Sequence, residues 1–219
     1  MPPRVIMAGA TGLTGALIAE RLLAAGSQVH ALVRRASGRV DPGWHEHVAP
    51  PRDWPEIVAE IPADAALSAL GTTLRKAGSE AGFRAVDHDL VLEFARAARG
   101  AGARHMVTIS SVGADADSRN FYLRLKGEVD EALGRIGFDR LDILRPGLLR
   151  GPRGPERRLG ERLGILVSPL VDLLLRGRLG DYAAIDAAAV AAAAVALLDD
   201  REPGIFVHHN RDLRRLARG

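Results

Sequence analysis

Cysteine is absent from this chain of 219 residues. The sequence therefore excludes disulfide bonds, cysteine nucleophiles and metal sites built from thiolates. Aromatic residues are also scarce, at 4% of the chain, so the expected core consists mainly of alanine, leucine and valine. Lysine occurs only at Lys76 and Lys126, because arginine supplies nearly all of the positive charge. A lysine at a motif position is therefore informative.

Long apolar runs are missing as well. No segment reaches the roughly 18 apolar residues that a membrane-spanning helix needs. Residues 1–4 lead directly into an apolar run, and no signal peptide is visible, so we expect a cytoplasmic protein that does not insert into membranes. The net charge is only +3. The arginines between 150 and 162 have no aromatic residues among them, which favours a solvated lid or a contact with an acidic substrate over nucleic-acid binding.

Apolar, strand-like segments alternate with helical patterns along the chain. This alternation is typical of a parallel, doubly wound α/β sheet with helices on both faces. The length suits one domain, 1–219, in which 1–147 form the nucleotide-binding core and 148–219 a short substrate or lid part and the C-terminal part. The expected strands begin at Val5 and span 28–33, 47–49, 64–71, 104–109, 138–144 and 204–208, and the expected helices span 13–25, 79–100, 163–175, 186–198 and 210–218.

Three glycines separate the first expected strand from the first expected helix. Gly9 can take the positive φ of a tight turn, Gly12 lets backbone amides approach an anion, and Gly15 lets the helix pack closely on the strand. An ordinary tight turn can have the same spacing, but the strand, turn and helix context favours a diphosphate at the helix N-terminus. The predicted cofactor contacts here are Gly9, Ala10, Thr11, Gly12, Leu13, Thr14 and Gly15.

Two arginines, Arg34 and Arg35, follow the second expected strand. In a dinucleotide-binding unit an acidic residue at this place binds the ribose 2′-hydroxyl of NAD. Arginine instead pairs with phosphate, so the sequence predicts NADP rather than NAD as the cofactor. The alternative is a pair of solvated arginines at a strand end.

A second polar strand end, Leu70, Gly71, Thr72 and Thr73, falls on the same edge of the expected sheet. Open α/β sheets bind ligands at this edge, so these residues are also predicted to contact the cofactor, although a plain loop start explains them equally well. His45 and His47 alternate as strand residues do, but no third ligand has a fitting spacing. We therefore predict no metal site.

The chemistry-bearing residues come after the strand expected at 104–109. Tyr122 and Lys126 are four residues apart in a helical pattern, so both project from one face. A neighbouring ammonium favours the tyrosinate form and brings a tyrosine closer to acid or base work at neutral pH. A hydroxyl from Ser110 or Ser111 can bind a substrate carbonyl as charge develops on it. Together these groups could move a proton to or from an oxygen during hydride transfer.

The glycine turn, the Ser110-Ser111 strand end and the Tyr122/Lys126 pair resemble the short-chain dehydrogenase/reductase superfamily, over about residues 4–150. More narrowly, the chain resembles an atypical NAD(P)-binding branch with a Rossmann fold. That branch includes the Tat-interacting protein and small bacterial oxidoreductase-like relatives. The segments that carry this narrower resemblance are 9–15, 70–73, 111–115, 122–128 and 144–147.

The resemblance implies roles for individual residues. Tyr122 would be the acid/base, Lys126 would hold the nicotinamide ribose, Ser110 or Ser111 would polarise the substrate, and Pro146 would lie near the nicotinamide. Two features depart from the superfamily. The serine-to-tyrosine spacing is slightly short, and Asp87 takes the place of an asparagine found in many relatives, so the usual proton relay is in doubt.

The expected activity is an NADP-dependent oxidation or reduction of a small alcohol or carbonyl substrate. The alternative is a redox-sensing or regulatory protein that binds NADP(H) without turnover and signals to a protein partner. In another alternative, Tyr122 is a half-buried tyrosine that only packs in the fold, and the chain then lacks this acid/base group. The expected assembly is a monomer or a homodimer, and the short region after 147 implies a small substrate pocket.

Overall fold

The computed structural model describes residues 2–151 and 181–218. In this part of the chain, seven strands form one parallel sheet in the order β3-β2-β1-β4-β5-β6-β9, and the strand order reverses between β1 and β4. This architecture confirms the predicted doubly wound fold. The strands are β1 (Arg4–Ala8), β2 (Gln28–Val33), β3 (Trp44–Val48), β4 (Ala65–Ser68), β5 (His105–Ile109), β6 (Arg140–Arg145) and β9 (Gly204–His209), and a small ladder pairs β7 (Leu149–Arg150) with β8 (Ile185–Asp186).

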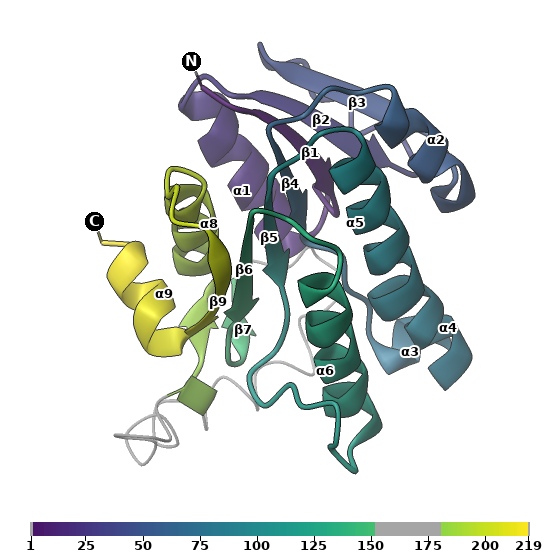
Figure 1. Cartoon of the computed structure of the whole chain (residues 1–219), viewed down its shortest axis with the longest axis vertical. Helices are drawn as coiled ribbons and strands as arrows, with labels where there is room; N and C mark the ends of the chain where they lie inside the picture. Colours follow the sequence, from purple (N-terminus) through teal and green to yellow (C-terminus); the bar gives the residue numbers. More distant parts are fainter. Residues whose placement is uncertain (1, 152–180, 219) are drawn as a thin grey trace.

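Helices cover both faces of the sheet (Figure 1). Alternate residues of the strands point to opposite faces, so each strand contributes side chains to two cores. On β1, for example, Val5 and Met7 join a cluster with α1, α8 and α9, while Ile6 and Ala8 join one with α2, α5 and α6. The helices are α1 (Leu13–Ala24), α2 (Trp54–Ala59), α3 (Leu74–Ala77), α4 (Glu80–Arg84), α5 (Leu90–Gly100), α6 (Phe121–Gly134), α8 (Ala187–Leu197) and α9 (Asn210–Leu216), with a 3-10 turn at Pro51–Asp53.

The strand expected at 64–71 is shorter than predicted, because the ladders of β4 with β1 and β5 end at Ser68 and the next residues pass beside Gly9. Asp186 does precede α8, as expected, but its side chain makes no capping hydrogen bond. The helix expected at 163–175 and the arginines Arg153, Arg157, Arg158 and Arg162 lie outside the described residues. Within the described ranges, no helix is both long enough and apolar enough to cross a bilayer.

The helix expected at 79–100 contains a π-helical turn, Ala85–Asp89, between α4 and α5. Such turns insert an extra residue and rotate the helix register, and they often occur at functional sites. Here the turn directs Asp87 inward, where only 1% of the residue is exposed. A simple helical periodicity does not reveal this change.

A largely buried ionic cluster joins β5, β6 and β9. Asp142 accepts hydrogen bonds from His105 Nε2 at 2.6 Å, from His208 Nε2 at 2.7 Å and from Arg140 Nε at 2.7 Å. Burial alone would raise the pKa of Asp142, but the bonds from His105, His208 and Arg140 outweigh it and hold that pKa well below its usual range. The carboxylate is therefore ionised inside the sheet, where it neutralises Arg140.

Three histidines gather on neighbouring strands β2 and β3. The ring of His30 stacks on His45 with 4.7 Å between centroids, and His30 Nδ1 lies 3.2 Å from His47 Nε2. Burial, the neighbouring His45 and His47, and Arg4 lower the pKa of His30 from 6.5 to about 4. No group of three or more His, Asp or Glu residues in the described parts of the chain is arranged to hold a metal ion.

The lowered pKa of His30 predicts an acid-sensitive fold. Because the unfolded chain takes up this proton near pH 6.5 and the folded chain only near pH 4, the contribution of His30 to stability is present above 6.5 and is lost as the pH falls toward 4. We expect His30→Gln to flatten this part of the pH profile, measured as the urea midpoint at a series of pH values. A variant profile as steep as that of the wild type would contradict the assignment.

Candidate cofactor and active site

The glycine turn between β1 and α1 packs so tightly that side chains cannot enter it. Gly9 has a φ of +84°, and a Cβ there would lie 2.5 Å from the carbonyl O of Ala69. A Cβ at Gly15 would overlap the carbonyl O of Gly9. Gly12 is the N-cap of α1, makes no side-chain cap and has no acidic residue after it in the first turn. The amides at this helix end therefore fit a diphosphate.

The other predicted contacts in this turn divide into two groups. Thr11 is exposed and Leu13 half-buried, so their side chains can reach a ligand. Ala10 and Thr14 are only 4% and 6% exposed, so they can contribute little beyond their backbone. The turn thus presents mainly backbone groups to the crevice.

The segment after β4 lies directly beside the glycine turn, because the backbone of Ala69 and Leu70 contacts Gly9. Thr72 donates its backbone N–H to Asp87 Oδ2 at 2.7 Å, and Gly71 lies close to the same carboxylate. Thr73 caps α3 by accepting from the backbone N–H of Lys76. The four predicted residues 70–73 therefore border the crevice, with the hydroxyl of Thr73 already engaged.

Arg34 and Arg35 are both exposed just after the carboxyl end of β2. Neither forms an ion pair or a hydrogen bond with another residue in the part of the chain that the structure describes. Two guanidinium groups are thus available at the sheet edge where the glycine turn also lies. This arrangement fits a phosphate ligand.

Tyr122 and Lys126 project from the first turns of α6, which begins at the carboxyl edge of the sheet after the cap of Asn120. The half-buried ring of Tyr122 packs on Phe83, with 5.7 Å between centroids. No described residue forms a hydrogen bond with its hydroxyl. Lys126 is buried, and its Nζ lies 2.9 Å from Asp87 Oδ1. Asp87, which takes the place of an asparagine in many relatives, is therefore the ion-pair partner of this lysine.

The two serines after β5 have different surroundings. Ser110 is 8% exposed and donates its hydroxyl to Asp130 Oδ2 at 3.0 Å. Ser111 is half-buried, and among the described residues its hydroxyl donates only to the carbonyl O of Val112, at 3.2 Å. The hydroxyl of Ser110 is thus held in the interior, while that of Ser111 stays near the surface.

Asp130 was not anticipated from the sequence, although it follows Lys126 by one helical turn. Its Oδ2 also accepts hydrogen bonds from Arg145 at 2.9 Å, and its Oδ1 is buried with no partner among the described residues. Burial raises the pKa of Asp130, although the bond from Ser110 and the charge of Arg145 oppose the rise. Asp130 thereby ties α6 to the ends of β5 and β6.

The loop after β6 contains the predicted residue Pro146, which is buried and accepts from the backbone N–H of Val112 at 2.9 Å. The next residue, Gly147, donates to Asn210 Oδ1 at 2.9 Å. Asn210 in turn donates to the carbonyl O of Ala183 at 2.6 Å. These bonds bring Tyr182 to the candidate site. No sequence pattern indicated this residue.

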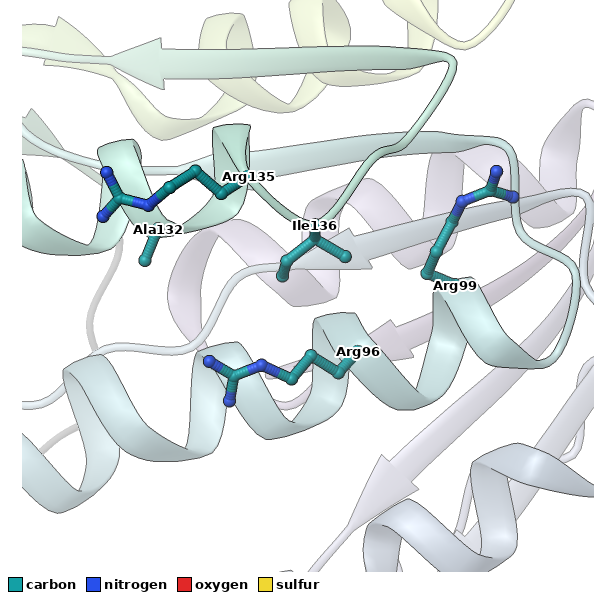
Figure 2. A pocket seen from close by; sticks show the side chains of 5 residues that line it. All are labelled: Arg96, Arg99, Ala132, Arg135 and Ile136. Atoms are coloured by element: carbon teal, nitrogen blue, oxygen red, sulfur yellow. The ribbon is translucent and has the colours of Figure 1, made fainter.

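An open pocket of about 410 Å³ lies elsewhere, between the C-terminal halves of α5 and α6 (Figure 2). Its side chains are Arg96, Arg99, Ala132, Arg135 and Ile136. Because both helices end at the amino edge of the sheet, this pocket is remote from the glycine turn and contains none of the predicted site residues. Arg99 is already engaged with the carbonyl O of Gly137 at 2.8 Å.

Two solved structures show the same fold at low sequence identity. WbmH from Bordetella bronchiseptica, in complex with NAD+, aligns with a TM-score of 0.69 and 16% identity over 99% of this chain and 79% of that chain. Human epimerase family protein SDR39U1, with NADPH, aligns with a TM-score of 0.64 and 18% identity over 94% and 74%. Structures of this fold thus carry either nicotinamide cofactor.

Two named relatives are similar in sequence. Protein FMP52, mitochondrial, from Eremothecium gossypii is 37% identical over 209 residues, which cover 90% of this chain and 89% of the relative. Protein HTATIP2 from Rattus norvegicus is 36% identical over 165 residues, 73% of this chain and 67% of the relative. The cytoplasmic location expected from the N-terminus is contradicted by the first relative and by similar FMP52 proteins, which are named mitochondrial.

The match to a family model extends from the first strand to the start of α6. The model of the NAD dependent epimerase/dehydratase family matches residues 5–124, which include the glycine turn, Ser110, Ser111 and Tyr122. The resemblance to short-chain dehydrogenases and to the branch of the Tat-interacting protein is confirmed by this match and by HTATIP2. The chain belongs to the NAD dependent epimerase/dehydratase family.

Proposed function

We propose that this protein is an oxidoreductase that transfers a hydride between NADP(H) and a small carbonyl or alcohol substrate. The main support is the arrangement at the start of α6, where the Tyr122 hydroxyl has no partner among the described residues and the buried Lys126 follows one turn later. The glycine turn, with its uncapped helix end, lies at the same edge of the sheet.

A bound nicotinamide cofactor would supply the hydride to the substrate carbon, or accept it in the reverse direction. In reduction, Tyr122 donates its hydroxyl proton to the carbonyl oxygen, so an O–H bond forms as the C=O π bond breaks. The phenolate left on Tyr122 is stabilised by the Lys126 ammonium and regains a proton from solvent. Asp87 holds Lys126 in place through the 2.9 Å ion pair.

Ser111 is the serine we assign to the substrate. The hydroxyl of Ser110 is committed to Asp130, whereas the hydroxyl of Ser111 makes only a weak contact with its neighbouring carbonyl. A donor beside the substrate oxygen stabilises the charge that develops there. Ser110 instead positions the strand end through Asp130.

For the cofactor, we propose NADP(H) over NAD(H), because Arg34 and Arg35 are exposed and unpaired with described residues at the end of β2. A charged hydrogen bond to a 2′-phosphate contributes about 1.5–3 kcal/mol, so Arg34→Ala should weaken NADPH binding by about tenfold or more and leave NADH binding unchanged. Titration followed by fluorescence measures both affinities. Arg21→Ala, at the opposite end of α1, is the matched control. Equal NADPH and NADH affinities in the wild type would overturn the proposal.

A redox-sensing function without turnover is the competing candidate. It is favoured by the Asp87–Lys126 ion pair, which already neutralises the lysine that should assist Tyr122. A screen of carbonyl and alcohol substrates, followed by the absorbance of NADPH, separates the two functions. Turnover of any substrate that depends on Tyr122 supports the oxidoreductase, and NADPH binding without any turnover supports the sensor.

A further inference from the structure

The segment 181–183 packs directly on the loop after β6. A Cβ at Gly147 would overlap the carbonyl O of Ala183 and would lie 3.0 Å from that of Asp181. Asn210, which is fully buried, bonds to both Gly147 and Ala183. The backbone of Tyr182 is therefore fixed beside the loop that contains Pro146.

The side chain of Tyr182 reaches from this loop to the serine loop. Its hydroxyl lies 3.7 Å from the Cβ position of Gly113, and the side chain of Leu123 lies 3.6 Å from the same point. The residue is 54% exposed, and its hydroxyl has no hydrogen bond to any described residue. Leu123 directly follows Tyr122 on α6, so Tyr182 lies near the first turn of the helix that carries Tyr122.

Apolar and charged side chains both lie near this rim, because Asp181, the neighbour of Tyr182, lines a small pocket with His209, Arg211 and Asp212. Leu148, next to Gly147, is 63% exposed. Two further cations, Lys126 and Arg145, are already paired with Asp87 and Asp130. A carboxylate or phosphate on the substrate would therefore find no unpaired partner in these two groups, whereas a planar ring can pack against a tyrosine ring.

We propose that Tyr182 is a substrate-contacting residue that selects planar, aromatic carbonyl compounds. This inference rests on the proposed function, since the same substrate must reach Tyr122. The Tyr182 ring packs against the aromatic body of the substrate, and its hydroxyl is available for a polar substituent.

The test uses the protein saturated with NADPH and a probe that cannot react. Benzamide is planar and resists reduction, and cyclohexanecarboxamide is its non-planar counterpart. By isothermal titration calorimetry, we expect the wild type to prefer benzamide, and Tyr182→Ala to weaken benzamide binding by about tenfold. Tyr182→Phe keeps the ring and should retain most of the affinity. Val48→Ala, an exposed apolar position on β3, is the control that should bind as the wild type does.

The outcomes separate this inference from the proposed function. If the wild type shows no preference for benzamide, or if Tyr182→Ala binds it equally well, the assignment of Tyr182 is wrong even when carbonyl turnover is observed. If the ring-dependent binding is found but no aromatic aldehyde or ketone is reduced, the binding site stands and the oxidoreductase function fails.

Discussion

The Tyr122→Phe variant is expected to lose about 100- to 10,000-fold in the rate of NADPH-dependent carbonyl reduction, the range that a positioned general acid contributes. The change removes only a hydroxyl that bonds to no described residue and leaves the ring on Phe83. The fold and the NADPH affinity should therefore stay the same. The measurements are initial rates at saturating NADPH, cofactor titration and thermal melting.

A matched control comes from the neighbouring residue Phe121, which also packs near Phe83. Phe121→Tyr places a hydroxyl on the adjacent helical position, about 100° around α6, where it points in another direction. The double variant Tyr122→Phe/Phe121→Tyr should remain as slow as Tyr122→Phe alone. Unchanged turnover in Tyr122→Phe would show that Tyr122 is not the acid/base and would exclude the proposed mechanism.

Asp142→Ala is expected to destabilise the protein by about 3–5 kcal/mol, because it removes the buried partner of Arg140 and leaves only the exposed carboxylate of Asp200 to pair with this buried charge. Domains of this kind have unfolding free energies of about 5–15 kcal/mol, so much of the stability would disappear. The two imidazoles of His105 and His208 would lose an acceptor at the same time. Urea denaturation at neutral pH measures the loss.

The control is Asp139→Ala, which removes a carboxylate from partly exposed bridges with Arg99 and Arg104 and should cost about 1 kcal/mol or less. An equal loss of unfolding free energy in both variants would contradict the expectation that the buried ion pair of Asp142 and Arg140 contributes more than an exposed one. The lowered pKa of Asp142 also predicts how stability depends on pH. The contribution of Asp142 to the free energy of unfolding is present above the pKa of the unfolded chain and declines as the pH falls toward the pKa of the folded chain. The difference between wild type and Asp142→Ala should therefore shrink in strong acid.

Most of the fold could be predicted because the parallel strands are short, apolar and separated by glycine or proline. The strand at Gln28–Val33 has the predicted bounds, and Tyr122 and Lys126 lie on one helix, α6, as the helical pattern predicted. The π-helical turn at Ala85–Asp89 could not be predicted, since a helical pattern of 22 residues averages over one inserted residue. The buried cluster of Asp142 was also missed, because its partners come from three strands.

The candidate site follows from the sequence where a local motif carries it. Gly9, Tyr122 and Lys126 lie at fixed spacings, and the structure brings them to one edge of the sheet. The partner of Lys126 is Asp87, 39 residues earlier in the chain, and only the tertiary structure joins the two. Tyr182 has no motif around it and reaches the site because Asn210 holds its neighbour.

The bonds from Asn210 have a consequence for the order in which the site is completed during synthesis. The backbone N–H of Gly147 donates to a side chain that lies 63 residues later, close to the C-terminus. The contacts between the glycine turn and the segment after β4 involve only early residues, although α8 and α9 complete the core behind the turn. A nascent chain can therefore form these early contacts first. The segment that contains Tyr182 is fixed beside Gly147 only when α9 has left the ribosome.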